Sequence, residues 1–311
     1  MSGVKRAYVA SHFALELGDG SNNAVIGFVR SVEGGGIKAE MLTYQQGVNS
    51  DLWRQIGKPK FEDITVQVGM GMSERFWKWI RAFFARDILR QNGAVLGADF
   101  GYVERTRRTF REALISEIQL PAVDGSSKDP CYMTVKISPE QLAYEGGTQK
   151  KITCSPGLKS PQKKWLAANF DLQLEGYDEG LKRVQKVDGL TIKQQILDYQ
   201  YGQARMPTKS PGRMDFPNLT FYIPEVDSKV FVDAVKKRVV DGDVISEGKK
   251  NGALTYLASD MSDLCTVTLK GIDILSCEPE KFEASSENIH RVKVLVQVES
   301  MEFEYNPDAV A

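Results

Sequence analysis

Apolar and polar residues alternate over several short stretches of the chain. Residues 12–17 place Phe13, Leu15 and Leu17 on one face, and residues 64–68 read Ile-Thr-Val-Gln-Val. Near the end, residues 292–298 carry valine at every second position. A period of two predicts strands with one packed face and one face in water, as in an antiparallel sheet.

Helical spacing interrupts the strands once in each half of the chain. Ser73 can cap the first helix, in which Phe76 and Trp77 are expected to fill the core. Trp79 points elsewhere on this helix and is expected to meet a neighbouring subunit. Strands, one helix and further strands predict a mainly β fold, a β-sandwich or barrel with one packed helix per domain.

The second helix is predicted from Phe231, Val235 and Val239, which recur every four residues. Residues 236–238, Lys-Lys-Arg, are expected on its outer face.

The two halves of the sequence repeat each other. Tyr44-Gln-Gln-Gly47 returns as Tyr199-Gln-Tyr-Gly202, 155 residues later. The strand that begins at His12 matches the one at Asn169, and Tyr144 matches Tyr305 at a displacement of 161. One register kept across so many positions indicates a tandem duplication.

The duplication divides the chain into two domains, residues 1–146 and 167–311. Residues 147–166 between them are rich in Gly, Pro, Ser and Lys and lack periodicity, which predicts an exposed linker.

Composition excludes several classes of protein. Lys and Arg number 40 against 41 Asp and Glu, so no net charge favours nucleic acid or an anionic membrane surface. No apolar run is long enough to span a bilayer, and residues 1–20 lack the apolar centre of a signal peptide, which predicts cytoplasmic assembly. The four cysteines form no CxxC pair and are expected to be free thiols.

Candidate chemistry is sparse. His12 and His290 are the only histidines, and neither lies at metal-ligand or triad spacing. Gly69-Met-Gly71 lacks the third glycine of a dinucleotide fingerprint. The arginines of residues 105–111 could bind phosphate, but a solvated face or a salt-bridge contact between rings is favoured. We therefore expect no catalytic residue, no cofactor and no metal.

At this point the order of motifs resembles the tail-tube proteins of contractile phages and the inner-tube proteins of phage-derived extracellular injection systems. The first half carries the motif at Val32, Gly34, Tyr44, Gly47, Gly57, Lys58, Thr65 and Trp77. The second half keeps Val187, Gly189, Tyr199, Gly202, Gly212, Arg213 and Thr220, with Val232 in place of the helix Trp. An ordinary tube subunit has a single such domain, so the duplication is the main departure.

The resemblance implies a structural, non-enzymatic protein. In the family, six domains close a ring and rings stack into the inner tube of a contractile apparatus. The expected partners are copies of the chain itself, other tube, baseplate, spike-hub or cap proteins, and the sheath. The resemblance implies neither specific nucleic-acid binding nor stable membrane insertion, and the finished particle can be released from the cell.

The position of this ring in the apparatus stays open between bulk tube, tube initiator and terminal or adaptor ring. A soluble β-sandwich that binds a ligand is the alternative. Three chains could close one ring, or six chains could form two stacked rings. The divergent outer faces of the two halves suit stacked layers that meet different partners, and they also suit a three-fold ring that matches a trimeric spike. The six-chain stack is favoured because each layer then keeps six identical contacts.

Overall fold

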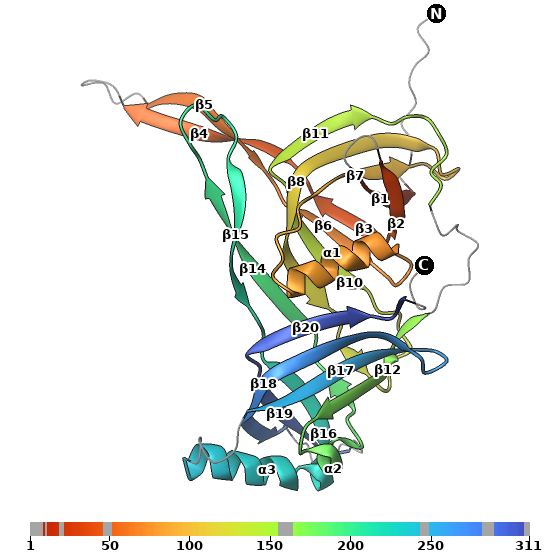
Figure 1. The fold of residues 1–311 in the computed structure, drawn as a ribbon, viewed down its shortest axis with the longest axis vertical. Helices are drawn as coiled ribbons and strands as arrows, with labels where there is room; N and C mark the ends of the chain where they lie inside the picture. The colour runs from red at the N-terminus through yellow and green to blue at the C-terminus, as the bar shows by residue number, and fades with distance from the viewer. Residues whose placement is uncertain are drawn as a thin grey trace, which may run out of the picture.

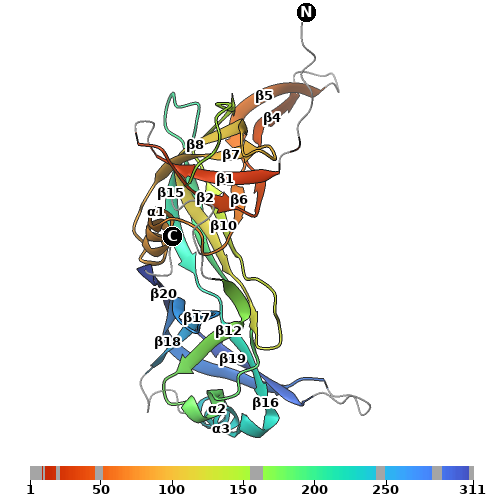
Figure 2. The same ribbon diagram turned by 90° about the vertical axis from the view of Figure 1, so that its right-hand side faces the viewer.

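The computed structural model describes residues 9, 11–18, 22–45, 52–154, 164–242, 249–281 and 289–307 of the 311-residue chain. Strands dominate, and the two halves lie one above the other along the longest axis (Figures 1 and 2). The first half contains β1 (His12–Leu17), β2 (Ala24–Val29), β3 (Ser31–Gly34), β4 (Ile37–Gln45), β5 (Leu52–Phe61), β6 (Ile64–Val68), α1 (Glu74–Phe84), β7 (Gln91–Ala98), β8 (Glu104–Leu120), β9 (Val123–Asp124), β10 (Met133–Ser138) and β11 (Gln141–Gly146). The second half contains β12 (Trp165–Leu174), α2 (Asp178–Leu181), β13 (Lys186–Val187), β14 (Leu190–Tyr199), β15 (Thr208–Asp215), β16 (Leu219–Pro224), the 3₁₀ turn η1 (Glu225–Asp227), α3 (Lys229–Val235), the π-helical turn η2 (Lys236–Val240), β17 (Lys250–Ala258), β18 (Asp263–Pro279), β19 (Arg291–Gln297) and β20 (Ser300–Tyr305).

One long strand in each half belongs to two sheets. The first part of β8 pairs with β7 and β11, and its last part pairs with β10, which leads to β6 and β3. In the same way β18 pairs first with β17 and β20 and then with β19, which leads to β16 and β13. Glu112 at φ 49° and Gly271 at φ 65° lie at the point where each strand passes from one sheet to the other. The two halves therefore share one strand order, as expected of a duplication.

Strand register corrects one detail of the repeat. Tyr144 lies opposite Arg108, and Phe303 lies opposite Val267, so both pairs differ by 159 residues. The structural counterpart of Tyr144 is Phe303, and the sequence match to Tyr305 was wrong by two residues. The equivalence follows from how β11 and β20 pair with β8 and β18. The sequence match instead aligned two tyrosines because they are the same residue type.

Helix α1 buries more aromatic surface than its sequence predicts. Phe76 and Trp77 are fully buried, as expected. Trp79 was expected on the outside but is only 1% exposed, and its indole Nε1 donates a hydrogen bond to the carbonyl of Leu89 at 2.9 Å. The segment after the helix, in which Arg86 adopts φ 63°, thus brings Leu89 against this side of α1.

The second helix departs from its predicted face. Phe231 is fully buried and Val235 packs against the core, but Val239 is 59% exposed. The turn from Lys236 to Val240 is π-helical, so the four-residue spacing no longer returns Val239 to the packed face. The same turn brings Arg238 within 3.5 Å of Asp273, with only 9% of its side chain exposed, where an outer position was expected.

The segment after β11 covers the first sheet. The backbone amide of Gly147 donates to the carbonyl of Arg105, that of Ile152 donates to Tyr102, and the Ile152 side chain packs on Ala14. The polar face expected for β1 is therefore buried, and Glu16 is only 7% exposed. Residues 147–152 thus bond to the first half, while 148–151 are exposed, as expected of the linker. At the other end Trp165 already belongs to β12, and residues 155–163 lie outside the described part of the chain.

The second half also differs from the prediction of one helix per domain. The short α2 (Asp178–Leu181) follows β12 at the place where β2 follows β1. Its Leu181 is buried, and Tyr177 before it stacks on Phe231 of α3 at a centroid distance of 5.4 Å. The extra helix therefore fills the core beside the packed helix.

Candidate assembly surfaces

The second half adds a strand to the sheet of the first. Leu190 of β14 lies opposite Leu120 of β8, and Ile192 lies opposite Ile118, in an antiparallel pairing of four residues. All four of these side chains are at most 1% exposed. The β14–β15 hairpin thus continues the first half's sheet, which is the geometry of β-strand addition.

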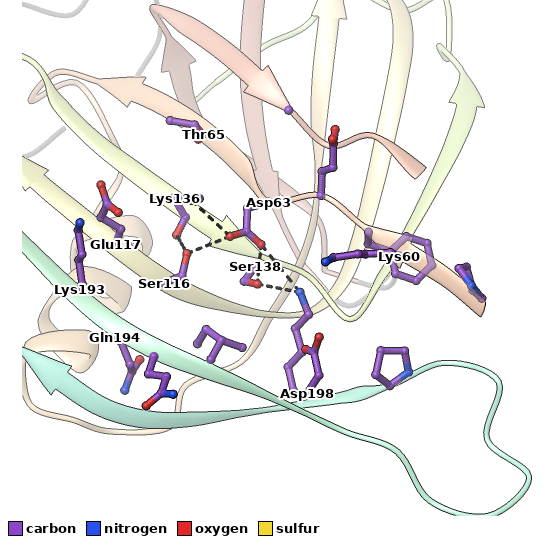
Figure 3. Close-up of a pocket in the computed structure, with 18 of the residues that line it drawn as sticks. Lys60, Asp63, Thr65, Ser116, Glu117, Lys136, Ser138, Lys193, Gln194 and Asp198 are labelled. Atoms are coloured by element: carbon purple, nitrogen blue, oxygen red, sulfur yellow. Dashed lines mark hydrogen bonds and ion pairs between the residues drawn. The ribbon is translucent and has the colours of Figure 1, made fainter. Parts of the chain in front are cut away.

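Lys209 of β15 fixes this hairpin against the first half. Its backbone amide donates to Glu140 Oε1 at 2.6 Å, and its Nζ donates to the hydroxyl of Ser138 at 2.8 Å. Ser138 in turn donates to Asp63 Oδ1 at 2.6 Å, and Lys209 Nζ is 3.9 Å from that same oxygen. Figure 3 shows the bond between Ser138 and Asp63.

Arg90 completes the link from the first half. Its Nη2 donates to the carbonyl of Lys209 at 2.6 Å, and its Nη1 is 2.5 Å from Glu140 Oε1. Both backbone groups of Lys209 are therefore bound by side chains of the other half. Charge-assisted bonds to nearly buried groups are among the stronger polar contacts in proteins.

A polar cleft of about 1300 Å³ separates the two hairpins above this link. Gly34, Lys58, Thr65 and Arg213 from the predicted motif line it, and Lys58 also bonds to Gln200 of the second hairpin. Ser138 borders the cleft but is only 2% exposed, and its hydroxyl is held by Asp63. Because a buried and already bonded hydroxyl is inaccessible to a substrate, this Ser–Lys contact fits a structural link better than a nucleophile.

Helix α1 forms a second contact between the halves. The ring of Trp77 stacks on Phe303 of β20 at a centroid distance of 6.0 Å, and Phe84 stacks on it at 5.4 Å. Phe303 is only 2% exposed as a result. Trp77 and Phe84 therefore bury apolar surface of the other half, in addition to the core that α1 shares with its own sheets.

The arginine cluster is used inside the first half. Arg107 Nη1 lies 2.5 Å from Glu16 Oε1, and its Nε lies 2.8 Å from Glu104 Oε1. The hydrogen bond to Glu16 is the main cause that raises the pKa of Arg107, against the opposing effect of burial. Arg105 pairs with Asp99 at 2.7 Å. For these two arginines, intramolecular ion pairs replace the expected solvated face or contact between rings.

The β4–β5 hairpin carries many exposed apolar side chains. It pairs with no other strand in the described structure and projects from the body (Figure 1). Its exposed apolar residues are Ile37, Met41, Leu42, Tyr44, Leu52, Trp53 and Ile56, each at least 44% exposed. So many exposed apolar side chains on one hairpin indicate an interaction site.

The other motif residues have structural positions on or near the hairpins. Gly34, at φ 79°, ends β3 where a Cβ would lie 2.2 Å from the carbonyl oxygen of Asp63, so only glycine fits. Tyr44 and Tyr199 are exposed on equivalent strands, and Gly202 adopts φ 41° in the second hairpin turn. Gly47 lies outside the described residues.

The remaining motif residues support the strands. Val187 is fully buried in β13, whereas its counterpart Val32 is partly buried in β3. Thr220 is half-buried in β16. A Cβ on Gly57 or Gly212 would lie 3.1 or 3.2 Å from the facing strand's carbonyl oxygen, and one on Gly189 would lie 2.8 Å from the carbonyl oxygen of Leu120.

Sequence reasoning missed the residues that join the halves. Arg90, Glu140 and Lys209 meet from positions 50 to 119 residues apart along the chain. No periodicity marks them, because each contact depends on how two domains dock. Two further results apply to the described residues alone: no group of three or more His, Cys, Asp or Glu side chains could hold a metal ion, and no helix is long and apolar enough to cross a membrane.

Comparison with known proteins finds a family that the first half is similar to. Residues 9–143 match the family described as T4-like virus tail tube protein gp19. A search of curated proteins finds no match.

Solved structures align with about half of the chain. The sheath–tube complex of the extracellular contractile injection system PVC, in the extended state, is 18% identical, covers 46% of this chain and 94% of that chain, and gives a TM-score of 0.39. The tube-terminating cap of the anti-feeding prophage is 16% identical, covers 47% and 95%, and gives 0.39. Hcp1 from the E. coli EAEC 042 pathovar is 13% identical, covers 46% and 94%, and gives 0.27. The segment that matches the T4-like virus tail tube protein gp19 family, residues 9–143, thus covers less than half of the chain, and residues 165–305 repeat its strand order from β1 onward, without a counterpart of β2.

Proposed function

We propose that this chain is a structural subunit of the inner tube of a phage tail or contractile injection apparatus, in which it forms a ring. The observation that carries the proposal is the strand addition of β14 to β8, which joins two tube-type domains edge to edge in one sheet. Joining further domains in the same way removes open sheet edges, which would otherwise promote aggregation.

The shared sheet favours three chains in one ring, with both domains of each chain side by side. In the family that the sequence resembles, six domains close a ring. Two domains that extend one sheet behave as ring neighbours, whereas stacked layers would meet through their ends. We therefore propose this arrangement in place of the six-chain stack that the sequence favoured for its six identical contacts per layer.

The proposed role is not enzymatic, and the proposed partners are other tube, baseplate, spike-hub or cap proteins together with the sheath. The exposed ends of both hairpins, which include Tyr199 and Trp53, offer apolar surface for such neighbours. Assembly in the cytoplasm, followed by release with the particle, is part of the same proposal. The polar cleft does not favour the alternative of a ligand-binding module, because ligand pockets are mostly apolar.

Native mass spectrometry and negative-stain electron microscopy of the purified chain test this proposal. We expect a ring with a central hole and the mass of three chains of 34.7 kDa each. A six-chain particle with two layers would overturn the side-by-side arrangement. A monomer that persists at high concentration, alone and with its tube and baseplate partners, would overturn the tube function.

A further inference from the structure

The contact between the two halves joins a hairpin to a sheet edge. Each half has such a hairpin and such an edge, so one hairpin and one edge stay without this contact. Inside the chain, the hairpin of the second half occupies the sheet edge of the first half. The hairpin of the first half, β4–β5, pairs with no other strand in the described structure. The equivalent edge of the second half, Ser276–Pro279 of β18, pairs there with β19 on one side only.

Residues in the paired hairpin and edge are buried, whereas their counterparts in the unpaired hairpin and edge are more exposed. Ile192, in the occupied position of β14, is 0% exposed, whereas its counterpart Ile37 in β4 is 44% exposed. Ile118, which lies opposite Ile192, is 0% exposed, whereas its counterpart Cys277 is only partly buried. The unpaired hairpin therefore carries an apolar residue where the paired hairpin is sealed by the other half.

We infer that the β4–β5 hairpin of one chain adds to β18 of the next chain, in the register that β14 uses on β8. The register pairs Ile192 with Ile118 and Lys193 with Glu117. Carried over by the strand equivalences, it places Ile37 opposite Cys277 and Lys38 opposite Ser276 of a second copy. The occupant of the exposed hairpin is thus the sheet edge of another copy of this chain.

The helices support the same contact independently. Within the chain, Trp77 and Phe84 of α1 cover Phe303 of β20. Their counterparts Val232 and Val239 lie on α3 and the π-helical turn after it, and they are 48% and 59% exposed. Tyr144, the counterpart of Phe303, is 58% exposed on β11. In the proposed contact, the chain whose β18 receives the hairpin lays Val232 and Val239 over Tyr144 of the chain that supplies it.

The contact is head to tail, because the first half of one chain meets the second half of another. Repetition of such a heterologous contact closes into a ring when its rotation divides a full turn. The inference rests on the proposed function in one respect, that the chain assembles with itself. The pairing of strands follows from the repeat within the chain.

A single substitution tests the register, because Cys277 is already in place. Residues directly opposite each other in antiparallel strands have Cα atoms about 4.5 to 5.5 Å apart, within the range that a disulfide spans. In a C154S background, the variant Ile37→Cys is oxidised and run on a non-reducing gel. We expect most chains to become linked to another chain, as dimers and larger closed species, and reduction to return them to monomers.

Matched variants show whether a disulfide forms because of the proposed register or through random encounters between chains. Lys38→Cys, one residue along and on the opposite face, should not link to Cys277, but K38C/S276C should link. I37C/C277S should not link. In a C154S/C277S background, I118C/I192C reports the template contact as an intrachain bond, which increases gel mobility without joining chains.

The results distinguish a failure of the strand register from a failure of the proposed tube function. If I37C does not link while native mass spectrometry finds multi-chain particles, the strand register is overturned and the tube function stands. If the wild-type chain remains monomeric with its tube and baseplate partners as well, the function proposal fails first. If K38C links to Cys277 as efficiently as I37C does, the pairing is shifted and this register is wrong.

Discussion

Ile192 and Ile118 lie directly opposite each other in paired strands of different halves, and both side chains are fully buried. The first belongs to the hairpin of the second half, and the second belongs to the long strand of the first half. The core is therefore continuous across the two domains, and the apolar packing of each half extends into the other through this pair. Unfolding of one half is expected to expose apolar surface of the other.

Replacement of Ile192 by Ala should destabilise the whole chain by about 2–5 kcal/mol, the usual cost of truncating a buried aliphatic side chain. Urea unfolding followed by fluorescence measures the loss. Leu197→Ala on the same strand is the matched control, because Leu197 is 49% exposed, and its effect on the unassembled chain should stay within about 0.5 kcal/mol. Equal effects of the two substitutions would contradict the docking of β14 on β8.

The Lys209–Asp63 contact should be coupled across the two halves. Lys209→Met should destabilise the chain by about 1–3 kcal/mol, because Asp63 and Ser138 lose a buried partner. A double-mutant cycle with Asp63→Asn should give a coupling energy of about 0.5–3 kcal/mol.

Lys193→Met is the control for this cycle, because Lys193 is an exposed lysine of the same cleft. Its effect should be within about 0.5 kcal/mol. A coupling energy near zero would show that the two halves are not held together by this network.

Periodicity and the internal repeat predict the fold well, and they fail where two domains meet. The alternation over residues 64–68 and 292–298 became β6 and β19, and Phe76 and Phe231 entered the core as expected. Val239 left the core because a π-helical turn changed the spacing, and no pattern in the sequence marks that turn. The contacts of Lys209 were invisible for another reason: its partners are set by domain docking, which local spacing does not encode.

Acid should weaken the first half through Glu104. Burial acts to raise the pKa of Glu104, but hydrogen bonds from Arg107 and Thr148 outweigh it, and the net pKa is lower than the ordinary 4.5. Because the folded pKa is the lower one, this carboxylate stabilises the fold above the unfolded pKa. Its contribution is lost as the pH falls through the folded value. Urea unfolding at pH 7 and at several values below 4.5 measures this dependence.

Glu104→Gln should lower stability at pH 7 and flatten the acid-side fall relative to wild type. The exposed Glu304→Gln should leave the pH profile unchanged. The assignment is wrong if the wild type and E104Q lose stability in parallel as the pH falls.

The two helices give the last prediction, because their equivalent residues have different surroundings. Phe76 and Phe231 are both 0% exposed, so replacement of either by Ala should cost about 3–5 kcal/mol in the unassembled chain. The neighbouring pair differs: Trp77 is 0% exposed against the other half, whereas Val232 is 48% exposed. Trp77→Ala should therefore cost about as much as Phe76→Ala, while Val232→Ala should change the stability of the unassembled chain by less than about 0.5 kcal/mol.

Val232→Asp should leave the stability of the unassembled chain similarly unaffected but weaken self-association, because a charge would be buried against Tyr144 of the next chain. Denaturant unfolding of dilute protein and sedimentation velocity at high concentration separate the two effects. If Val232→Asp assembles as well as the wild type, α3 does not cover Tyr144 of the neighbouring chain, and this part of the proposed contact is wrong.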